Sequence, residues 1–79
     1  MSITLDLHGY TSCEGVREIQ KTIVLNPKCN CIEVIHGFNN GSSLKRLLEN
    51  KINIHSKRVK KTLAHPFNPG RTLVFLNII

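Results

Sequence analysis

Apolar and polar residues alternate at the start of the chain, from Ile3 to Gly9. A period of two residues is typical of a strand that buries one of its faces. The alternation predicts that Asp6 and His8 lie on the same face, at the carboxyl end of the strand. A carboxylate beside an imidazole can fix the tautomer of the ring and raise its basicity, so this pair is a candidate for acid–base chemistry. The same alternation would also place an Asp and a His on the solvent face of a strand that has no function.

A helix is predicted directly after this strand. Thr11 and Glu14 have the Thr-x-x-Glu spacing of a capping box, which marks the start of a helix. Pro27 ends the helix, because it cannot donate the next hydrogen bond and it pushes Asn26 out of the helical region. Between these signals, apolar residues recur at helical spacing and predict one buried stripe of Val16, Ile19, Ile23 and Val24.

Residues 31–37 form a second predicted strand, which also ends in His-Gly. A polar loop and a second helix follow, and the helix fades near residues 54–55. Two strand–helix units in succession imply parallel strands, since a right-handed crossover returns the chain to the same end of the sheet. We therefore expect the two His-Gly turns to lie at one edge of the sheet. The apolar stripe of this second helix is predicted to comprise Leu44, Leu47, Leu48 and Ile52.

Two further strands are predicted at residues 57–64 and 71–78, joined by a turn that contains two prolines and a glycine. The short link predicts an antiparallel pair, with the more hydrophobic last strand inside the sheet. The order βαβαββ then gives an α/β (α+β) two-layer sandwich, in which a mixed four-stranded sheet carries two helices on one face. A chain of 79 residues has room for one core, so we expect a single domain over residues 1–79.

The predicted topology gathers polar groups at the edge where the two parallel strands end. Asp6, His8 and His36 should meet there, together with the loop at 39–43 and with Lys45 in the first turn of the second helix. Helix N-termini at such an edge favour a bound phosphate. Cleavage of a phosphodiester would further require a base, an acid and positive charge on the phosphate.

Two chemistries are open at this edge. His8 and His36 could divide the acid and base roles, with Asp6 orienting His8. Lys45 or Arg71 would then hold the phosphate. Alternatively, Asp6 could help to hold a divalent metal ion such as Mg²⁺ that generates hydroxide. One carboxylate is too few for a two-metal site, so the metal version is disfavoured and no metal ligands are predicted.

The distribution of charge points to a polyanionic partner. Residues 1–40 carry three Lys or Arg and four acidic residues, a net charge of −1, whereas residues 41–79 carry eight Lys or Arg and one Glu, a net charge of +7. The simplest partner for such a basic half is DNA or RNA, and the alternative is a domain whose basicity is incidental.

The remaining composition excludes several classes. No apolar run approaches the roughly 20 residues of a membrane span. The N-terminus lacks the basic and apolar regions of a secretion signal. Three cysteines without a second ligand pair predict reduced thiols in the cytoplasm, not a zinc site.

Three segments together resemble the Smr (small MutS-related) domain, over nearly the whole chain from Thr4 to about Leu76. They are Leu-Asp-Leu-His-Gly at 5–9, Ile-His-Gly at 35–37 followed by Gly41 and Leu-Lys at 44–45, and Gly-Arg-Thr at 70–72 before a hydrophobic strand. The resemblance implies a fold similar to the C-terminal domain of a bacterial translation initiation factor. It also implies binding to DNA or RNA, and several Smr domains nick DNA or cleave RNA.

The resemblance assigns roles to particular positions. The Asp and His of the family's first motif correspond to Asp6 and His8. The second motif, His-Gly-x-Gly-x-Gly or Thr-Gly-x-Gly, corresponds to His36, Gly37 and Gly41. The late glycine and threonine correspond to Gly70 and Thr72.

This chain departs from the second motif in two places. Its middle glycine is Asn39, which tolerates a left-handed conformation and can keep the shape of the loop. The basic residue that often precedes it is Phe38, which lowers the phosphate affinity expected of the loop. Because Smr domains accept threonine at the position of His36, that residue is expected to position a ligand and not to serve as an obligatory acid.

The leading hypothesis is therefore a nucleic-acid-binding Smr domain with DNA-nicking or RNA-cleaving activity, in which Asp6 orients His8 as general base or phosphate ligand. One alternative is a non-catalytic module that delivers a larger MutS-like or ribosome-associated protein to nucleic acid. A third hypothesis is a protein-interaction domain. The residues expected to bind nucleic acid are His36, Gly37, Asn39, Gly41, Lys45, Arg71 and Thr72.

Overall fold

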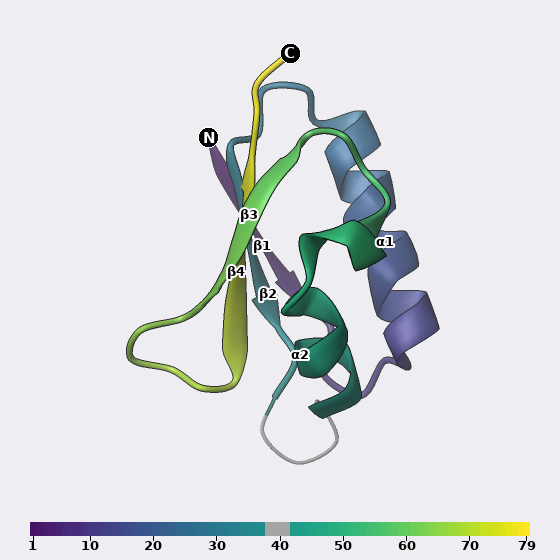
Figure 1. Cartoon of the computed structure of the whole chain (residues 1–79), viewed down its shortest axis with the longest axis vertical. Coiled ribbons are helices and arrows are strands. Elements are labelled where there is room, and N and C mark those ends of the chain that lie inside the picture. The colour runs from purple at the N-terminus through teal and green to yellow at the C-terminus, as the bar shows by residue number, and fades with distance from the viewer. Residues whose placement is uncertain (38–41) are drawn as a thin grey trace.

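A mixed four-stranded sheet and a layer of helices make up the described part of the chain, which comprises residues 1–37 and 42–79 of a computed structural model (Figure 1). The strand order is β1-β2-β4-β3. β1 (Ser2–Asp6) runs parallel to β2 (Cys31–Ile35), which pairs antiparallel with β4 (Arg71–Leu76). β3 (Val59–Ala64) pairs antiparallel with β4 at the edge. The predicted sheet, with the last strand inside it, is confirmed.

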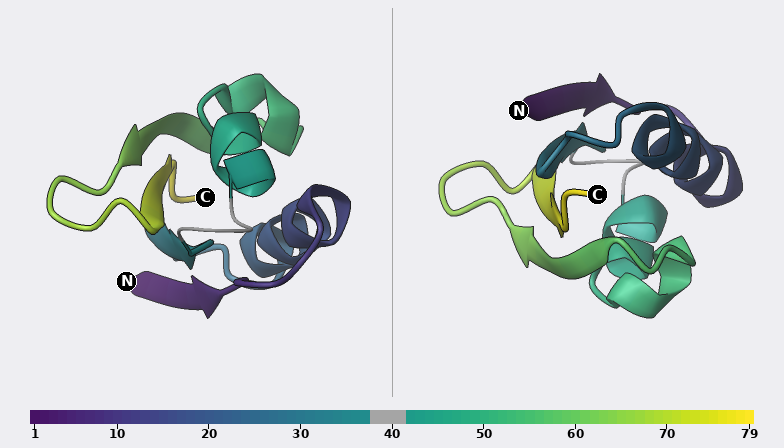
Figure 2. Two further views of the ribbon diagram at one scale, coloured as in Figure 1. Left: turned by 90° about the horizontal axis from the view of Figure 1, so that it is seen from below. Right: turned by 90° about the horizontal axis from the view of Figure 1, so that it is seen from above.

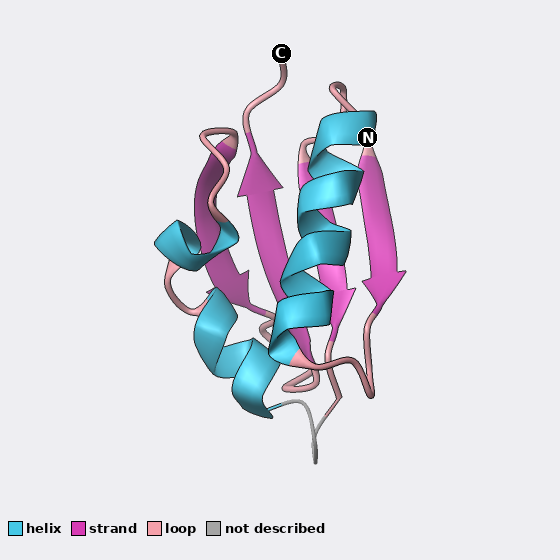
Figure 3. Ribbon diagram, turned by 90° about the vertical axis from the view of Figure 1, so that its right-hand side faces the viewer, coloured by secondary structure: helices cyan, strands magenta, loops and turns pink. Residues whose placement is uncertain are grey.

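The helices pack on one face of this sheet (Figures 2 and 3). They are α1 (Ser12–Leu25), α2 (Ser42–Leu48) and a short 3₁₀ helix, η1 (Lys51–Ile54). Within the described residues the opposite face of the sheet carries no helix (Figures 1 and 2). The two-layer α/β architecture predicted from the sequence is therefore correct. Among the described residues, no helix has the length and apolarity needed to cross a membrane.

α1 follows its predicted signals closely. The backbone N–H of Glu14 donates to Thr11 Oγ1 at 3.2 Å, and Thr11 N–H donates to Glu14 Oε1 at 3.0 Å, which completes the capping box. Ile19 and Ile23 are buried, as expected. Val24 is 76% exposed, so its place in the predicted stripe is wrong. It lies 100° around the helix from Ile23 and points away from the sheet.

The second helical segment is broken in two. α2 ends at Leu48, and η1 begins at Lys51. Between them the Asn50 side chain accepts a hydrogen bond from Ile52 N–H at 3.1 Å, which competes with continued helix formation. The new turn exposes Ile52 and buries Ile54, so the prediction of Ile52 as a core residue is wrong.

The core lies between the sheet and the helices. The two central strands bury alternate residues there, and α1, α2 and η1 supply the facing layer. The fully buried apolar side chains are Ile19, Ile32, Val34, Leu44, Leu48, Ile54, Val74 and Cys29. The two antiparallel strands are shorter than predicted: β3 starts at Val59 and β4 ends at Leu76.

Arg58 holds the carboxyl end of α1 against the sheet. Its guanidinium donates to the carbonyl oxygens of Ile23, Asn26, Pro27, Cys29 and Asn77. The last turn of α1 contains no basic residue of its own, so Arg58 supplies the positive charge that the helix C-terminus favours.

Candidate functional site

The ends of β1 and β2 meet, as the parallel pairing predicts. Leu7 N–H donates to the carbonyl oxygen of Ile35 at 2.8 Å, which extends the ladder past the last paired residues. A Cβ atom added at Gly37 would lie 3.6 Å from the Cβ atom of His8, so the two His-Gly turns are in contact. Gly9 and Gly37 have φ values of +82° and +81°, a region that favours glycine. The two turns therefore form one edge, as expected.

Asp6 and His8 form a hydrogen-bonded pair on the surface of this edge. Asp6 Oδ1 accepts from His8 Nδ1 at 2.5 Å and from the backbone N–H of His8 at 3.3 Å. The side chains are 55% and 72% exposed, respectively. With Nδ1 bound to Asp6, Nε2 is the ring nitrogen that can meet a ligand. This contact between residues two positions apart fixes the tautomer of His8.

The contact between Asp6 and His8 changes the pKa of each side chain in the direction that favours its charged form. The hydrogen bond that His8 donates to the Asp6 side chain, reinforced by the negative charge of Asp6, raises the pKa of His8. The side-chain and backbone hydrogen bonds from His8 lower the pKa of Asp6, and the charge of Arg71 acts in the same direction. His8 therefore carries a proton on Nε2 over a wider pH range than a free histidine. In that form it is a cation and a hydrogen-bond donor, while the deprotonated fraction can act as a base.

His36 lies inside the protein, with 1% of its surface exposed. Its Nδ1–H donates to the carbonyl oxygen of Gly37 at 3.1 Å, and the Thr72 hydroxyl donates to its Nε2 at 2.8 Å. Burial lowers the pKa of His36 against the opposing effect of the Gly37 hydrogen bond, and the charge of Lys45 lowers it further. Both ring nitrogens of this neutral histidine are occupied by the protein. The arrangement argues against a division of acid and base roles between His8 and His36.

Thr72 and Lys45 flank this buried histidine. Thr72 is itself buried, and its hydroxyl is the group that satisfies Nε2 of His36. Lys45, in α2, lies near enough for its charge to lower the pKa of His36. Lys45 and Thr72 also line the same shallow hollow between α2 and β3. Thr72 and His36 are buried, whereas Lys45 is only partly buried and can present its charge at the surface.

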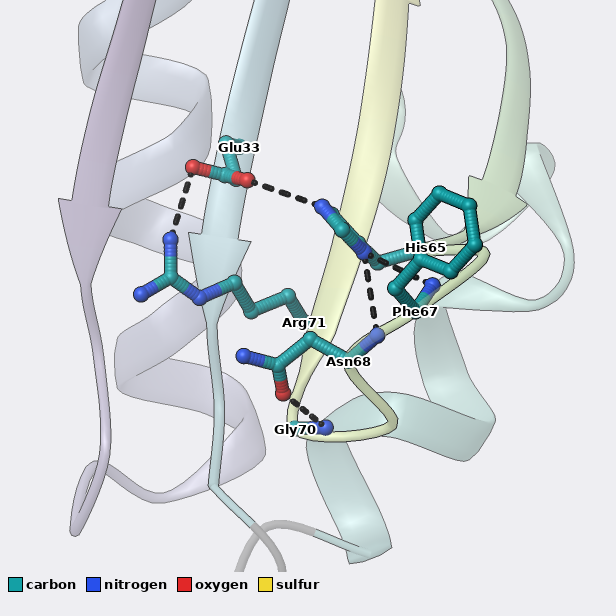
Figure 4. Close-up of polar contacts among 6 residues, drawn as sticks. All are labelled: Glu33, His65, Phe67, Asn68, Gly70 and Arg71. Carbon is teal, nitrogen blue, oxygen red and sulfur yellow. Dashed lines mark hydrogen bonds and ion pairs between the residues drawn. The ribbon is translucent and has the colours of Figure 1, made fainter.

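Arg71 lies across the sheet from Asp6, since Asp6 pairs with Ile35 and Ile35 with Arg71. Its guanidinium donates to Glu33 Oε2 at 2.9 Å, and the other carboxylate oxygen of Glu33 lies 3.5 Å from His65 Nε2 (Figure 4). The sequence did not indicate that Glu33 would contact both Arg71 and His65. Their proximity depends on the register of β2 against β4, for which the sequence contains no local signal.

The remaining predicted contacts fall on the loop between β2 and α2. Phe38, Asn39 and Gly41 lie outside the described residues, so only the flanks of the predicted phosphate loop are placed. The flank at Gly37 is held in position, because its backbone N–H donates to the carbonyl oxygen of Gly70 at 3.1 Å.

The described residues do not provide a metal-binding set. No group of three or more His, Cys, Asp or Glu side chains in residues 1–37 and 42–79 is placed to hold a metal ion. At the candidate edge, Asp6 is the one carboxylate and its near oxygen is bound to His8.

The fold matches that of a solved domain. It superposes on the crystal structure of the Smr domain of Thermus thermophilus MutS2 with a TM-score of 0.71, at 23% sequence identity, over 94% of this chain and 96% of that one. No protein-family model matches the sequence. No curated protein matches it either. At this identity the similarity establishes the fold, in agreement with the expectation from the sequence motifs.

Proposed function

We propose that this chain, which has the fold of an Smr domain, binds nucleic acid at the edge formed by its two His-Gly turns. The observation that carries the proposal is the exposed Asp6–His8 pair in contact with Gly37. Asp6 raises the pKa of His8, which favours the protonated form whose Nε2–H can donate to a phosphate oxygen. The basic residues of the second half of the chain supply the sequence-independent attraction to the phosphate backbone.

The other predicted binding residues divide into two groups in this proposal. Lys45 and Arg71 supply charge near the edge. His36 and Thr72 do not touch the ligand and instead hold Gly37, through the Nδ1 hydrogen bond of His36 to the Gly37 carbonyl oxygen. The positive φ at Gly37 turns the backbone there without the steric cost of a side chain.

The same pair is equipped for phosphodiester cleavage. The deprotonated fraction of His8 would take a proton from water or from a ribose 2′-hydroxyl, and Asp6 would stabilise the imidazolium that forms. The nucleophile then attacks phosphorus and the leaving oxygen departs, with Lys45 and Arg71 stabilising the developing charge. Because His36 has no free nitrogen, the leaving oxygen would take its proton from solvent or from the protonated His8. In this form of the proposal, the domain is an endonuclease in which His8 is the general base and Asp6 orients it.

Cleavage is tested by incubating purified protein with supercoiled plasmid and with structured RNA, with and without a chelator. Asp6→Ala and His8→Ala should each abolish cleavage. Thr4→Ala, on the exposed face of the same strand, is the matched control and should leave cleavage unchanged. Cleavage that persists at full rate in both site variants would identify a contaminating nuclease and overturn the catalytic assignment.

A non-catalytic role has its own support. The engagement of His36 leaves His8 as the single histidine with a free ring nitrogen among the residues described at this edge. The matched structure is, by its name, one domain of a MutS2 protein, which supports a module within a larger MutS-like chain. In this form of the proposal, the module is cytoplasmic and delivers that chain to nucleic acid or to the ribosome. Such a module would retard DNA or RNA in a mobility-shift gel, and the shift would decrease steeply as the salt concentration rises. It would yield no cleaved nucleic acid even after long incubation. A protein-interaction domain would give no salt-dependent shift.

A further inference from the structure

The most exposed aromatic side chain of the described residues lies in the loop that joins β3 to β4. Phe67 is 91% exposed, far more than Tyr10 at 42%. The hairpin loop, residues 65–70, extends from the sheet away from the two helices (Figure 2). A single exposed apolar residue on a mobile loop would need no explanation. The surroundings of Phe67, however, are fixed by several polar contacts.

His65 organises this hairpin loop (Figure 4). Its Nδ1 accepts hydrogen bonds from the backbone N–H groups of Phe67 at 3.1 Å and Asn68 at 3.0 Å. A nitrogen that accepts twice carries no proton, so the ring hydrogen is on Nε2, which faces Glu33. The ring of Phe67 meets that of His65 edge to face, with centroids 6.5 Å apart. Because Phe67 is 91% exposed, this contact leaves most of its side chain accessible to a ligand.

Further hydrogen bonds and two prolines complete the loop. Asn68 Oδ1 accepts from Gly70 N–H at 3.0 Å, and the backbone carbonyl oxygen of Asn68 accepts from Arg71 N–H at 3.1 Å. Pro66 and Pro69 fix two of the φ angles and lower the entropy cost of this conformation. Phe67 is therefore displayed on a preorganised support, which lowers the entropic cost of binding a ligand.

The loop is also attached to the candidate edge. The carbonyl oxygen of Gly70 accepts from the backbone N–H of His36 at 2.9 Å and from that of Gly37 at 3.1 Å. A nucleic acid whose phosphate meets His8 would thus have this loop at the neighbouring strand end. Residues 59–76 contain Lys60, Lys61 and Arg71 and no carboxylate, so the charge of the hairpin also suits a polyanion.

We infer that Phe67 is a stacking platform for an unpaired nucleobase, so that the domain prefers single-stranded or looped nucleic acid to a continuous duplex. The inference rests on the proposed nucleic-acid binding and adds a ligand class to it. Every base has a π-face, so stacking on Phe67 selects for unpaired bases and not for a sequence. Removal of a stacking aromatic is expected to weaken binding about 5- to 150-fold.

The chain contains no tryptophan, so Phe67→Trp introduces a unique fluorescent reporter at the site. Stacking of a base on the new indole should quench its emission when a short oligothymidine or oligouridine is added. Val24→Trp, at an exposed position on α1, is the matched control and should show no quenching. Equal quenching of both reporters would show a non-specific effect and overturn the inference.

Affinity is measured in parallel by the anisotropy of labelled single-stranded and duplex oligonucleotides. Phe67→Ala and Phe67→Leu should weaken single-strand binding about 5- to 150-fold and leave duplex binding nearly unchanged. Phe67→Tyr and Phe67→Trp should retain binding, as should Val24→Ala. Thermal unfolding of each variant checks the fold.

Three results of these binding measurements would contradict the inference in different ways. If the wild type binds but Phe67→Ala binds single strands equally well, stacking is overturned and the proposed function stands. If the wild type binds neither single strands nor duplex at low salt, both are overturned. An equal loss of single-strand and duplex binding in Phe67→Ala would also overturn the preference for unpaired bases.

Discussion

The imidazole of His36 accepts a hydrogen bond from the hydroxyl of Thr72 at 2.8 Å within the protein interior. The two residues are 36 positions apart in the sequence and meet because β2 and β4 are neighbours in the sheet. The pair fixes the tautomer of His36 and, through the Nδ1 hydrogen bond, the turn at Gly37. It therefore joins the packing of the sheet to the geometry of the candidate edge.

Thr72→Val should destabilise the protein through this pair. The substitution preserves the shape of the side chain but leaves Nε2 of His36 buried without a donor, which costs about 1–3 kcal/mol. The free energy of unfolding is measured with urea. Thr4→Val removes an exposed hydroxyl from β1 and should change stability by no more than about 0.5 kcal/mol. Equal stability of Thr72→Val and wild type would contradict the assigned hydrogen bond.

Arg58→Lys should be destabilising although it preserves the charge. A lysine ammonium is a compact point charge and cannot reproduce a fork that meets the carbonyl oxygens of α1 and of Asn77. We expect a loss of about 2 kcal/mol or more in the free energy of unfolding, measured by chemical denaturation. Lys57→Gln, at the exposed neighbouring position, is the control and should be close to neutral. A near-neutral Arg58→Lys would show that charge alone suffices.

The pKa of His8 should fall in Asp6→Asn, because the hydrogen bond and the charge that raise it are weakened or lost. An NMR titration of the imidazole hydrogens measures the pKa directly.

Because the pKa of His8 is raised on folding, its contribution to stability is complete below the unfolded pKa and is lost as pH rises through the folded pKa. The lowered pKa of Asp6 gives a contribution that is present above its unfolded pKa and is lost as pH falls through its folded pKa.

The affinity for nucleic acid should follow the protonation of His8. Binding weakens as pH rises through the pKa of His8, because the Nε2–H donor and its positive charge disappear. In Asp6→Asn the same decline should occur at lower pH, and in His8→Gln it should be absent. Anisotropy titrations at constant ionic strength across this range provide the measurement. An identical pH profile in His8→Gln and wild type would remove His8 from the binding site.

Glu33→Gln should strengthen binding. Glu33 pairs with the Arg71 guanidinium at 2.9 Å and places a negative charge on the open face of the sheet. Its neutralisation frees Arg71 for a phosphate, and we expect affinity to rise about two- to fivefold at low salt, with a smaller gain at high salt. Glu49→Gln removes an equal charge at an exposed position after α2 and is the control for net charge. Equal gains in both variants would indicate a general charge effect.

The sequence by itself determined the features that depend on neighbouring residues. The alternation around Asp6 and His8 predicted β1 and its polar pair, and the capping box at Thr11 and Glu14 predicted the start of α1. These contacts join residues two or three positions apart, so backbone geometry alone creates them. The two His-Gly turns, with the crossover rule, also located the edge where β1 and β2 end.

Only the tertiary structure decided which side chains at that edge are exposed and which are bound by other side chains. His36 and Thr72 match positions of the motifs but are buried and bonded to each other. Arg71 donates a hydrogen bond to Glu33, because the register of β2 against β4 brings these side chains together. The contact between His65 and Glu33 has the same origin, whereas the hydrogen bonds from Phe67 and Asn68 to His65 are local. Contacts of this kind depend on strand register and burial over the whole sheet, and local sequence spacing contains neither.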